Sequence, residues 1–198
     1  MRFFFLTNEP PSLEGEWAPP RELDKHLAAL RLGAAEDFLL MLPQGGAVRA
    51  RRNQTGALEL FGLAPMPKLD LMPVTLATAW PKGRRADDLV VRAAEAGVER
   101  ILPMVCERSV AGKEPLSSSK IARLRKLARE ACQQCGRPTP PVVERNPVPL
   151  ETVLDEAPAA RPVALVPGGW PLTMELGLHS PREVLLLVGP EGGFSEKE

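Results

Sequence analysis

A glycine-rich segment directly after an apolar run is the part of this sequence best suited to bind a ligand. Val184–Val188 predicts a buried strand, and Gly189–Phe194 follows it with three glycines and a proline. Glycine lets the backbone approach a ligand closely and adopt a positive φ. In parallel sheets, ligands bind beyond the carboxyl ends of the strands. The segment is therefore either a ligand loop or only a tight turn from a strand into a helix.

Several other chemistries lack the residues that they need. The chain has two histidines and three cysteines, which argues against a histidine-based metal site and a secreted disulfide framework. Cys132 and Cys135 are spaced C-x-x-C, but they fall in a predicted helix, where packing explains them better than zinc or redox chemistry. The sequence contains no phosphate-loop, dinucleotide-binding or nucleophile-elbow motif. We expect no metal site.

Basic side chains gather in the middle third of the chain. Residues 71–137 hold 13 basic and 7 acidic side chains, a net charge of +6, although the whole chain has a net charge of zero. Such a segment can bind phosphate groups. The alternative is that Arg123, Arg125, Lys126 and Arg129 form only the solvated side of an amphipathic helix.

Length and composition indicate a globular protein of one or two domains. The chain has 198 residues, of which 44% are hydrophobic and 25% charged. The apolar run at residues 184–188 is far shorter than the roughly 20 residues that cross a bilayer. We therefore expect a cytoplasmic protein that does not bind membranes.

The first 70 residues predict a small β-barrel or sandwich. Apolar runs at 3–6, 38–42 and 57–63 are short and are separated by turn residues. One helix is expected near residues 22–32, ended by Gly33. Residues 65–68 predict a linker.

From residue 71 onward the pattern predicts strands that alternate with helices, which indicates an α/β domain with a mainly parallel sheet. Ser118–Cys135 is expected to be a long helix, capped by the preceding serines and ended by Gly136. Strands are expected at residues 74–80, 100–106, 163–166 and 184–188, with helices at 87–96 and 150–156 and an extended piece at 141–144. The last two strands are continuously apolar, as in a sheet covered on both faces.

The last four residues have the pattern of a helix start. Ser195 and Glu198 match a capping box, in which Ser195 is the N-cap and Glu198 lies three residues later. A helix start needs a helix after it. We therefore expect that a further C-terminal segment belongs to this domain.

Seven stretches, in order along the chain, resemble motifs of the bacterial 16S ribosomal RNA (uracil-N3) methyltransferase family, which belongs to the knotted SPOUT class. The glycine segment Gly189–Ser195 resembles the family motif G-P-E-G-G-F-[ST]. The other six stretches are residues 1–4, 26–32, 82–87, 92–98, 107–110 and 130–137. Together they span nearly the whole chain, so their combination is more specific than any one of them.

The resemblance implies an N-terminal PUA-like RNA-binding β-barrel at residues 1–70 and a SPOUT methyltransferase domain at residues 71–198. It also implies a homodimer, S-adenosylmethionine as cofactor, and 16S ribosomal RNA or the small ribosomal subunit as substrate. The family has a further motif, I-L-R-x-E-T-A, that completes the cofactor pocket and the C-terminal trefoil knot. This sequence ends before that motif, so a non-catalytic RNA-binding remnant is the alternative.

Roles for individual residues can be expected within this function. Arg108 is the expected catalytic residue, because it directly follows the strand that ends near Cys106, where it could stabilise negative charge on O2 or O4 of uracil; a salt bridge to Glu107 or Glu130 is its structural alternative. The expected cofactor contacts are Leu165, Val166, Pro167, Gly189, Pro190, Glu191, Gly192, Gly193 and Phe194. The expected RNA contacts are Arg2, Arg31, Lys82, Arg84, Arg85 and Arg137. No general base can be identified.

Overall fold

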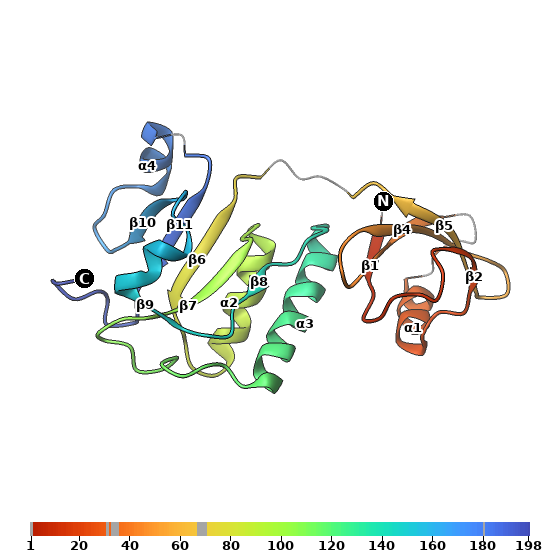
Figure 1. Cartoon of the computed structure of the whole chain (residues 1–198), viewed down its shortest axis with the longest axis horizontal. Coiled ribbons are helices and arrows are strands. Elements are labelled where there is room, and N and C mark those ends of the chain that lie inside the picture. Colours follow the sequence, from red (N-terminus) through yellow and green to blue (C-terminus); the bar gives the residue numbers. More distant parts are fainter. Residues whose placement is uncertain (1, 31, 33–35, 67–70, 180) are drawn as a thin grey trace. The chain divides into compact units, whose positions relative to one another are not determined.

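The computed structural model divides the chain into two compact units, Met1–Leu69 and Asp70–Glu198 (Figure 1). The structure describes residues 2–30, 32, 36–66, 71–179 and 181–198. The expected helix stop Gly33 and part of the expected linker lie outside these ranges.

The first unit is a five-stranded sheet with one helix. Its strands have the order β1-β3-β4-β5-β2, in which β1 and β3 are parallel and the other pairs antiparallel. The bounds are β1 Arg2–Phe5, β2 Glu14–Trp17, α1 Arg21–Ala29, β3 Asp37–Met41, β4 Ala47–Arg52 and β5 Leu58–Ala64. Within the described ranges β1 does not pair with β2, so a closed PUA-like barrel stays a prediction.

The core of the first unit explains why α1 forms where it does. Leu27 of α1 is fully buried and packs with Phe4, Phe38 and Leu58 from three strands. The rings of Phe4 and Phe38 meet edge to face, with their centroids 5.3 Å apart. The helix therefore covers one face of the sheet through a single apolar stripe.

The second unit is a mixed α/β fold whose described strand pairs are all parallel, as the sequence predicts. The main strand order is β10-β11-β6-β7-β8, and β9 also pairs with β7. The bounds are β6 Val74–Ala79, α2 Arg84–Glu95, β7 Arg100–Val105, α3 Ser118–Cys135, β8 Val142–Val143, β9 Val148–Pro149, the 3-10 helix η1 Leu150–Glu156, β10 Arg161–Leu165, α4 Leu172–His179 and β11 Val184–Val188. No helix in these ranges is long and apolar enough to span a membrane.

One face of this sheet is covered by η1. Ala77, Leu102, Met104 and Leu185 from β6, β7 and β11 form a buried cluster with Val153 of η1. Helices α2 and α3 pack against each other and bury apolar stripes of their own. The central strands are thus held by apolar packing up to the ends where their loops begin.

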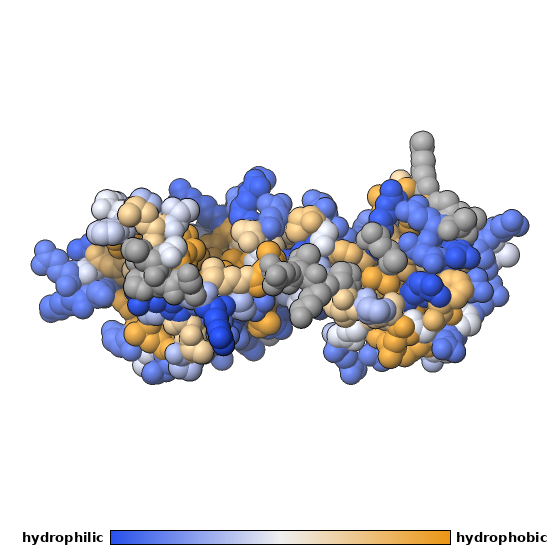
Figure 2. All heavy atoms as spheres, turned by 90° about the horizontal axis from the view of Figure 1, so that it is seen from above, coloured by the Kyte–Doolittle hydropathy of each residue, from blue (hydrophilic) through white to orange (hydrophobic). Residues whose placement is uncertain are grey.

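The sequence predicts that both faces of β10 are covered by other parts of the fold, and this prediction is wrong. Leu165 is 41% exposed, and most other side chains of the strand are also exposed. The strand lies at one end of the sheet order and pairs only with β11 among the described strands. Trp170 and Met174, which follow it, are exposed as well, and apolar atoms are visible around α4 in Figure 2.

Helix α3 begins and ends where the sequence predicts. Ser117 Oγ accepts a hydrogen bond from the Lys120 amide, as an N-cap side chain does. Gly136 has φ +82° and ends the helix in the left-handed conformation.

Arg137, expected to contact RNA, is instead a buried structural residue. Its side chain is 7% exposed, and Nη1 donates to the carbonyl oxygens of Ala94 and Val98 at 3.2 and 2.5 Å. These carbonyls lie in the last turn of α2 and in the segment directly after it, so the guanidinium joins the ends of α2 and α3. The burial argues against the predicted phosphate contact.

We expect Arg137→Met to lower the free energy of unfolding by about 1.5–3 kcal/mol, because the substitution leaves two carbonyls without their charged donor. Chemical denaturation measures this loss. Arg129→Met, at an exposed position on α3, is the matched control and should change the stability little. Equal stability of the two variants would contradict the structural role of Arg137.

Candidate functional site

Four loops leave the sheet of the second unit at the same edge. The parallel register pairs Leu165 of β10 with Val188 of β11, Val188 with Thr78 of β6, and Ala79 with Met104 of β7. The segments that follow these strands therefore begin side by side. This is the edge at which parallel sheets bind ligands.

The glycine loop after β11, Gly189–Phe194, is a tight turn. The Gly193 amide donates to the Pro190 carbonyl at 2.8 Å, and Gly193 has φ +68°. The ring of Phe194 folds back onto Gly189, where an added Cβ would lie 3.2 Å from the ring. Glycine is therefore favoured at position 193 by conformation, and a side chain at position 189 would need the Phe194 ring to move by a few tenths of an ångström.

Arg108 holds the glycine loop. Its Nη1 donates to the carbonyl oxygens of Gly192 and Phe194, at 2.7 and 3.1 Å. Neither of the expected alternative partners, Glu107 and Glu130, forms a salt bridge with it among the described residues. The side chain thus links the loop after β7 to the loop after β11.

Glu198 makes a second link between the same two loops. Its carboxylate accepts from the amides of Glu107 and Ser195, at 2.7 and 2.8 Å. The bond from Ser195 is one half of the predicted capping box. In the other half, Ser195 Oγ would accept a hydrogen bond from the Glu198 amide. This bond is absent, since the buried Ser195 Oγ has no hydrogen-bond partner among the described residues. Both hydrogen bonds lower the pKa of the Glu198 carboxylate, and the bond from the Ser195 amide has the larger effect.

The predicted cofactor segments are neighbours at this edge. Leu165–Pro167 follows β10, and the glycine loop follows the adjacent β11. Gly168, next to the first segment, has φ +76° and open space where a Cβ would lie. Leu165 and Val166 are 41% and 47% exposed, which leaves apolar surface beside the glycines.

The predicted basic residues have different surroundings. Lys82, Arg84 and Arg85 lie where β6 is followed by α2, and Arg85 pairs with Glu191 of the glycine loop at 3.3 Å. Arg2 lies in the first unit and pairs with Glu36. Arg31 lies outside the described residues.

Sequence reasoning missed the contact of Trp80 with the loop after β7. A Cβ added at Gly112, which has φ +78°, would overlap the Cβ of Trp80. Trp80 is 3% exposed and lines a cavity of about 250 Å³ at this edge. The only sequence signal was a tryptophan directly before Pro81-Lys82-Gly83.

Cys106, at the end of β7, is not a candidate nucleophile. Burial raises the pKa of its thiol to about 11. The thiol therefore stays protonated at neutral pH, and the thiolate is the reactive form.

A family model described as an RNA methyltransferase domain matches residues 67–198. The chain belongs to this family. The match confirms the resemblance drawn from the sequence motifs, and it includes all four loops at the edge of the sheet.

Curated relatives include proteins named ribosomal RNA small subunit methyltransferase E. The one from Synechocystis sp. is 28% identical over 177 residues, which is 85% of this chain and 57% of the relative. The one from Mycobacterium bovis is 28% identical over 131 residues, which is 64% of this chain and 50% of the relative. The chain thus spans between half and three-fifths of the length of these relatives.

Solved structures share the fold. A crystal structure of ribosomal RNA small subunit methyltransferase E from Neisseria gonorrhoeae, bound to S-adenosyl methionine, has a TM-score of 0.74 and 25% identity, and the match covers 100% of this chain and 83% of that one. A Legionella pneumophila methyltransferase structure with bound cofactor has a TM-score of 0.73 and 23% identity, over 98% and 82% of the two chains.

The link made by Glu198 predicts a pH-dependent loop. Because the folded-state pKa of this carboxylate is lowered, its contribution to loop order is present above the ordinary pKa of glutamate and is lost as the pH falls through the folded value. NMR titration should show the amide signals of Glu107 and Ser195 moving together, with a midpoint below that of an ordinary glutamate.

Glu198→Gln should remove this titration, whereas Glu196→Gln, a control at an exposed position two residues away, should keep it. Unchanged titration of both amides in Glu198→Gln would contradict the assignment.

Proposed function

We propose that the chain belongs to an S-adenosylmethionine-dependent methyltransferase that acts on N3 of a uridine in 16S ribosomal RNA. The observation that carries this proposal is the adjacency of the two segments Leu165–Pro167 and Gly189–Phe194 at the carboxyl edge of a parallel sheet. The family match and the names of the relatives support it.

The residues at this edge fit such a cofactor. Gly168 and Gly193 turn the backbone with positive φ, and the space where each Cβ would lie is open. Backbone groups of both segments can therefore come close to a ligand, and the exposed side chains of Leu165 and Val166 offer apolar contact. When bound there, S-adenosylmethionine supplies a methyl group that is already activated on a sulfonium.

The chain's own residues then have to orient the reactants and stabilise charge. Arg108 and Glu198 hold the glycine loop from the neighbouring loop. We therefore propose Arg108 as a positioning residue, in place of the charge-stabilising role that its sequence position suggested. Its Nη1 is engaged by two loop carbonyls.

RNA contacts are proposed for the basic residues after β6. Arg84 is the first residue of α2 and has no ion pair among the described side chains. Arginine and lysine at such positions bind phosphate without reading the base. Arg2 of the first unit is retained as an RNA contact within the proposed PUA-like domain.

The resemblance further supports a cytoplasmic homodimer and a SPOUT knot. Dimer formation would cover apolar surface of the kind seen at Leu165, Trp170 and Met174, which are 41%, 73% and 49% exposed.

Methyl transfer to small ribosomal subunits, with mass spectrometry of the nucleosides, tests the function. We expect N3-methyluridine to form in the 16S RNA in the presence of the cofactor. RNA binding without cofactor binding or methyl transfer would instead show a non-catalytic RNA-binding protein.

The glycine loop offers a matched pair of variants. Gly193→Ala forces a side chain into the left-handed region, whereas an added Cβ at Gly192 meets Arg108 only at an ordinary 3.5 Å. We expect Gly193→Ala to weaken cofactor binding about tenfold, because a loop that relaxes from the left-handed conformation in the free protein must recover it on binding, at a cost of about 1–2 kcal/mol. Gly192→Ala should change the affinity little. Calorimetry measures both, and equal affinities would contradict the proposed cofactor contact.

Arg84→Ala should weaken RNA binding and lower the slope of log affinity against log salt by about one, as loss of one phosphate contact does. Arg137→Met should leave this slope unchanged, because that side chain is buried. An unchanged slope in Arg84→Ala would assign Arg84 to the solvated surface of α2.

A further inference from the structure

A cavity of about 450 Å³ opens between three segments at the carboxyl edge of the sheet in the second unit. These segments are the residues after β6, the loop at residues 106–117 between β7 and α3, and the first turn of α3. Each of them places one lysine in the lining, in this order Lys82, Lys113 and Lys120. The described part of the lining has one acidic side chain, Glu114, so three positive charges against one negative leave a net charge of +2.

The loop between β7 and α3 is held on both sides of Lys113. On one side, Gly112 lies against Trp80, where an added Cβ would overlap the Cβ of the tryptophan. On the other side, the Leu116 amide donates to the Arg145 carbonyl at 3.0 Å, and Arg145 Nε donates to the Leu116 carbonyl at 2.9 Å. The backbone position of Lys113 is therefore set before any ligand binds, which lowers the entropy lost on binding.

The charged side chains of this cavity have no partners of opposite charge. Neither the three lysines nor Glu114 forms an ion pair among the described residues. The Lys120 ammonium lies 5.8 Å from the ring centroid of Trp80, which also lines the cavity. The amides of residues 110–114 donate to no acceptor in the described part of the chain. Like charges that share a cavity repel one another, and an anion relieves this repulsion, so the cavity is suited to an anion.

The kind of cation indicates which anion fits. The ammonium of lysine is a compact point charge that binds phosphate oxygens from any direction, whereas the fork of arginine matches planar carboxylates best. The described lining contains lysines and no arginine. The cavity also shares Lys82 and Val110 with the smaller cavity that reaches the glycine loop. A phosphate held by these lysines is therefore close to the loop proposed to bind the cofactor.

We propose that this cavity, lined by Lys82, Lys113 and Lys120, binds one phosphate of the RNA backbone and so holds the RNA strand beside the glycine loop. The proposal rests on the proposed function and adds Lys113 and Lys120 to its RNA contacts. A contact to the backbone fixes the register and orientation of the RNA without reading the base.

A matched pair of lysines on α3 tests the cavity. Lys120→Met removes an ammonium from the lining and keeps most of the apolar stem, whereas Lys126→Met removes an exposed ammonium that pairs with Glu130 outside the cavity. We expect Lys120→Met and Lys113→Met each to weaken binding of 16S ribosomal RNA about tenfold, as loss of a hydrogen bond between charged groups does. Lys126→Met should change the affinity little. Equal RNA affinity of the three variants would overturn the proposal.

Neutral replacements in the RNA identify the phosphate itself. Single phosphates of a short 16S RNA fragment that binds the protein are replaced in turn by methylphosphonates, which carry no charge. One replacement should weaken binding to the wild-type protein about tenfold and have no further effect on Lys120→Met, because both changes remove the same contact. Replacements that all weaken both proteins equally would show that the cavity contacts no RNA phosphate.

Two further measurements separate the source of the phosphate and the role of the enzyme. The NMR signals of the Gly112 and Lys113 amides should shift with this RNA fragment at concentrations at which inorganic phosphate has no effect. An equal response to inorganic phosphate would assign the cavity to free phosphate and overturn the RNA contact. Normal RNA binding by the Lys113 and Lys120 variants of an active methyltransferase would overturn the cavity alone. Lysine-dependent RNA binding without methyl transfer would support the cavity and contradict the proposed function.

Discussion

The parallel register of β10, β11, β6 and β7 is the constraint on which the proposed site depends. Parallel neighbours must end at the same edge, so the sheet brings together four loops that are separated by up to about a hundred residues of sequence. The apolar cluster between the sheet and η1 fixes that register, because a shift by one residue would turn its buried side chains to the opposite face. The chemistry at the edge is then set by loop residues alone.

What joins these loops to one another is mostly bonding to the backbone. Arg108 and Glu198 both act on main-chain groups, and Gly112 brings backbone onto Trp80. A side-chain pair across the edge, Arg85 with Glu191, is more than two-thirds exposed on both sides and contributes little in such surroundings. The edge is therefore ordered where backbone contacts are dense, around the glycine loop.

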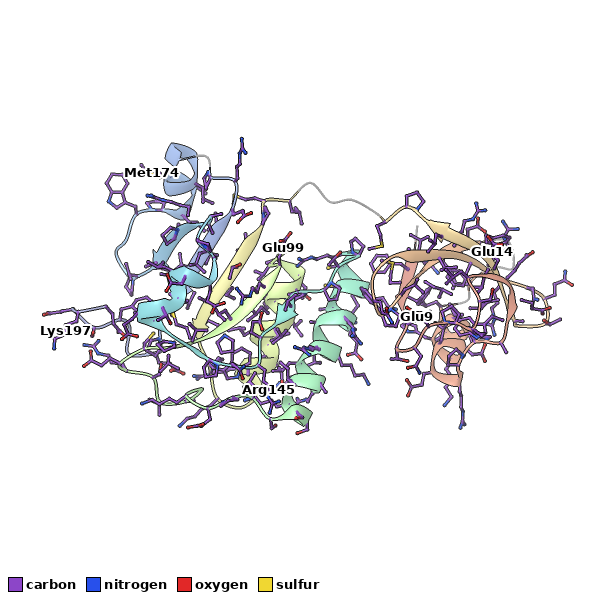
Figure 3. All side chains as sticks on the ribbon, viewed as in Figure 1. Glu9, Glu14, Glu99, Arg145, Met174 and Lys197 are labelled. Carbon is purple, nitrogen blue, oxygen red and sulfur yellow. The ribbon has the colours of Figure 1, made fainter. Side chains whose placement is uncertain are left out.

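Lys197 lies close to this loop in sequence, but its side chain extends away from the fold (Figure 3).

The sequence was most informative where local rules decide the structure. The bounds of α3 follow from its caps and those of β11 from its apolar run, and both match. Whether a strand face or a side chain is buried depends on segments far away in the sequence, so burial was not predictable. Strand β10 has the apolar sequence of a strand with both faces covered, yet most of its side chains are exposed. Arg137 resembles a cation of a solvent-exposed loop, yet it lies against the end of α2. Strand β4, which carries three arginines, was missed because half of its residues are polar. The glycine loop was found through its motif, but its link to Arg108 required the structure.

The strand order also dictates a sequence of events during folding. Strand β11 lies between β6 and β10, although it is the last of the three along the chain. Strand β10 pairs with no described strand other than β11, so it cannot join the sheet until β11 has been made. Contacts between segments so far apart in sequence form slowly, because a long loop has to close first. During synthesis the apolar residues of β10 therefore wait in an unpaired state, and this is the interval in which a chaperone would be of most use to the nascent chain.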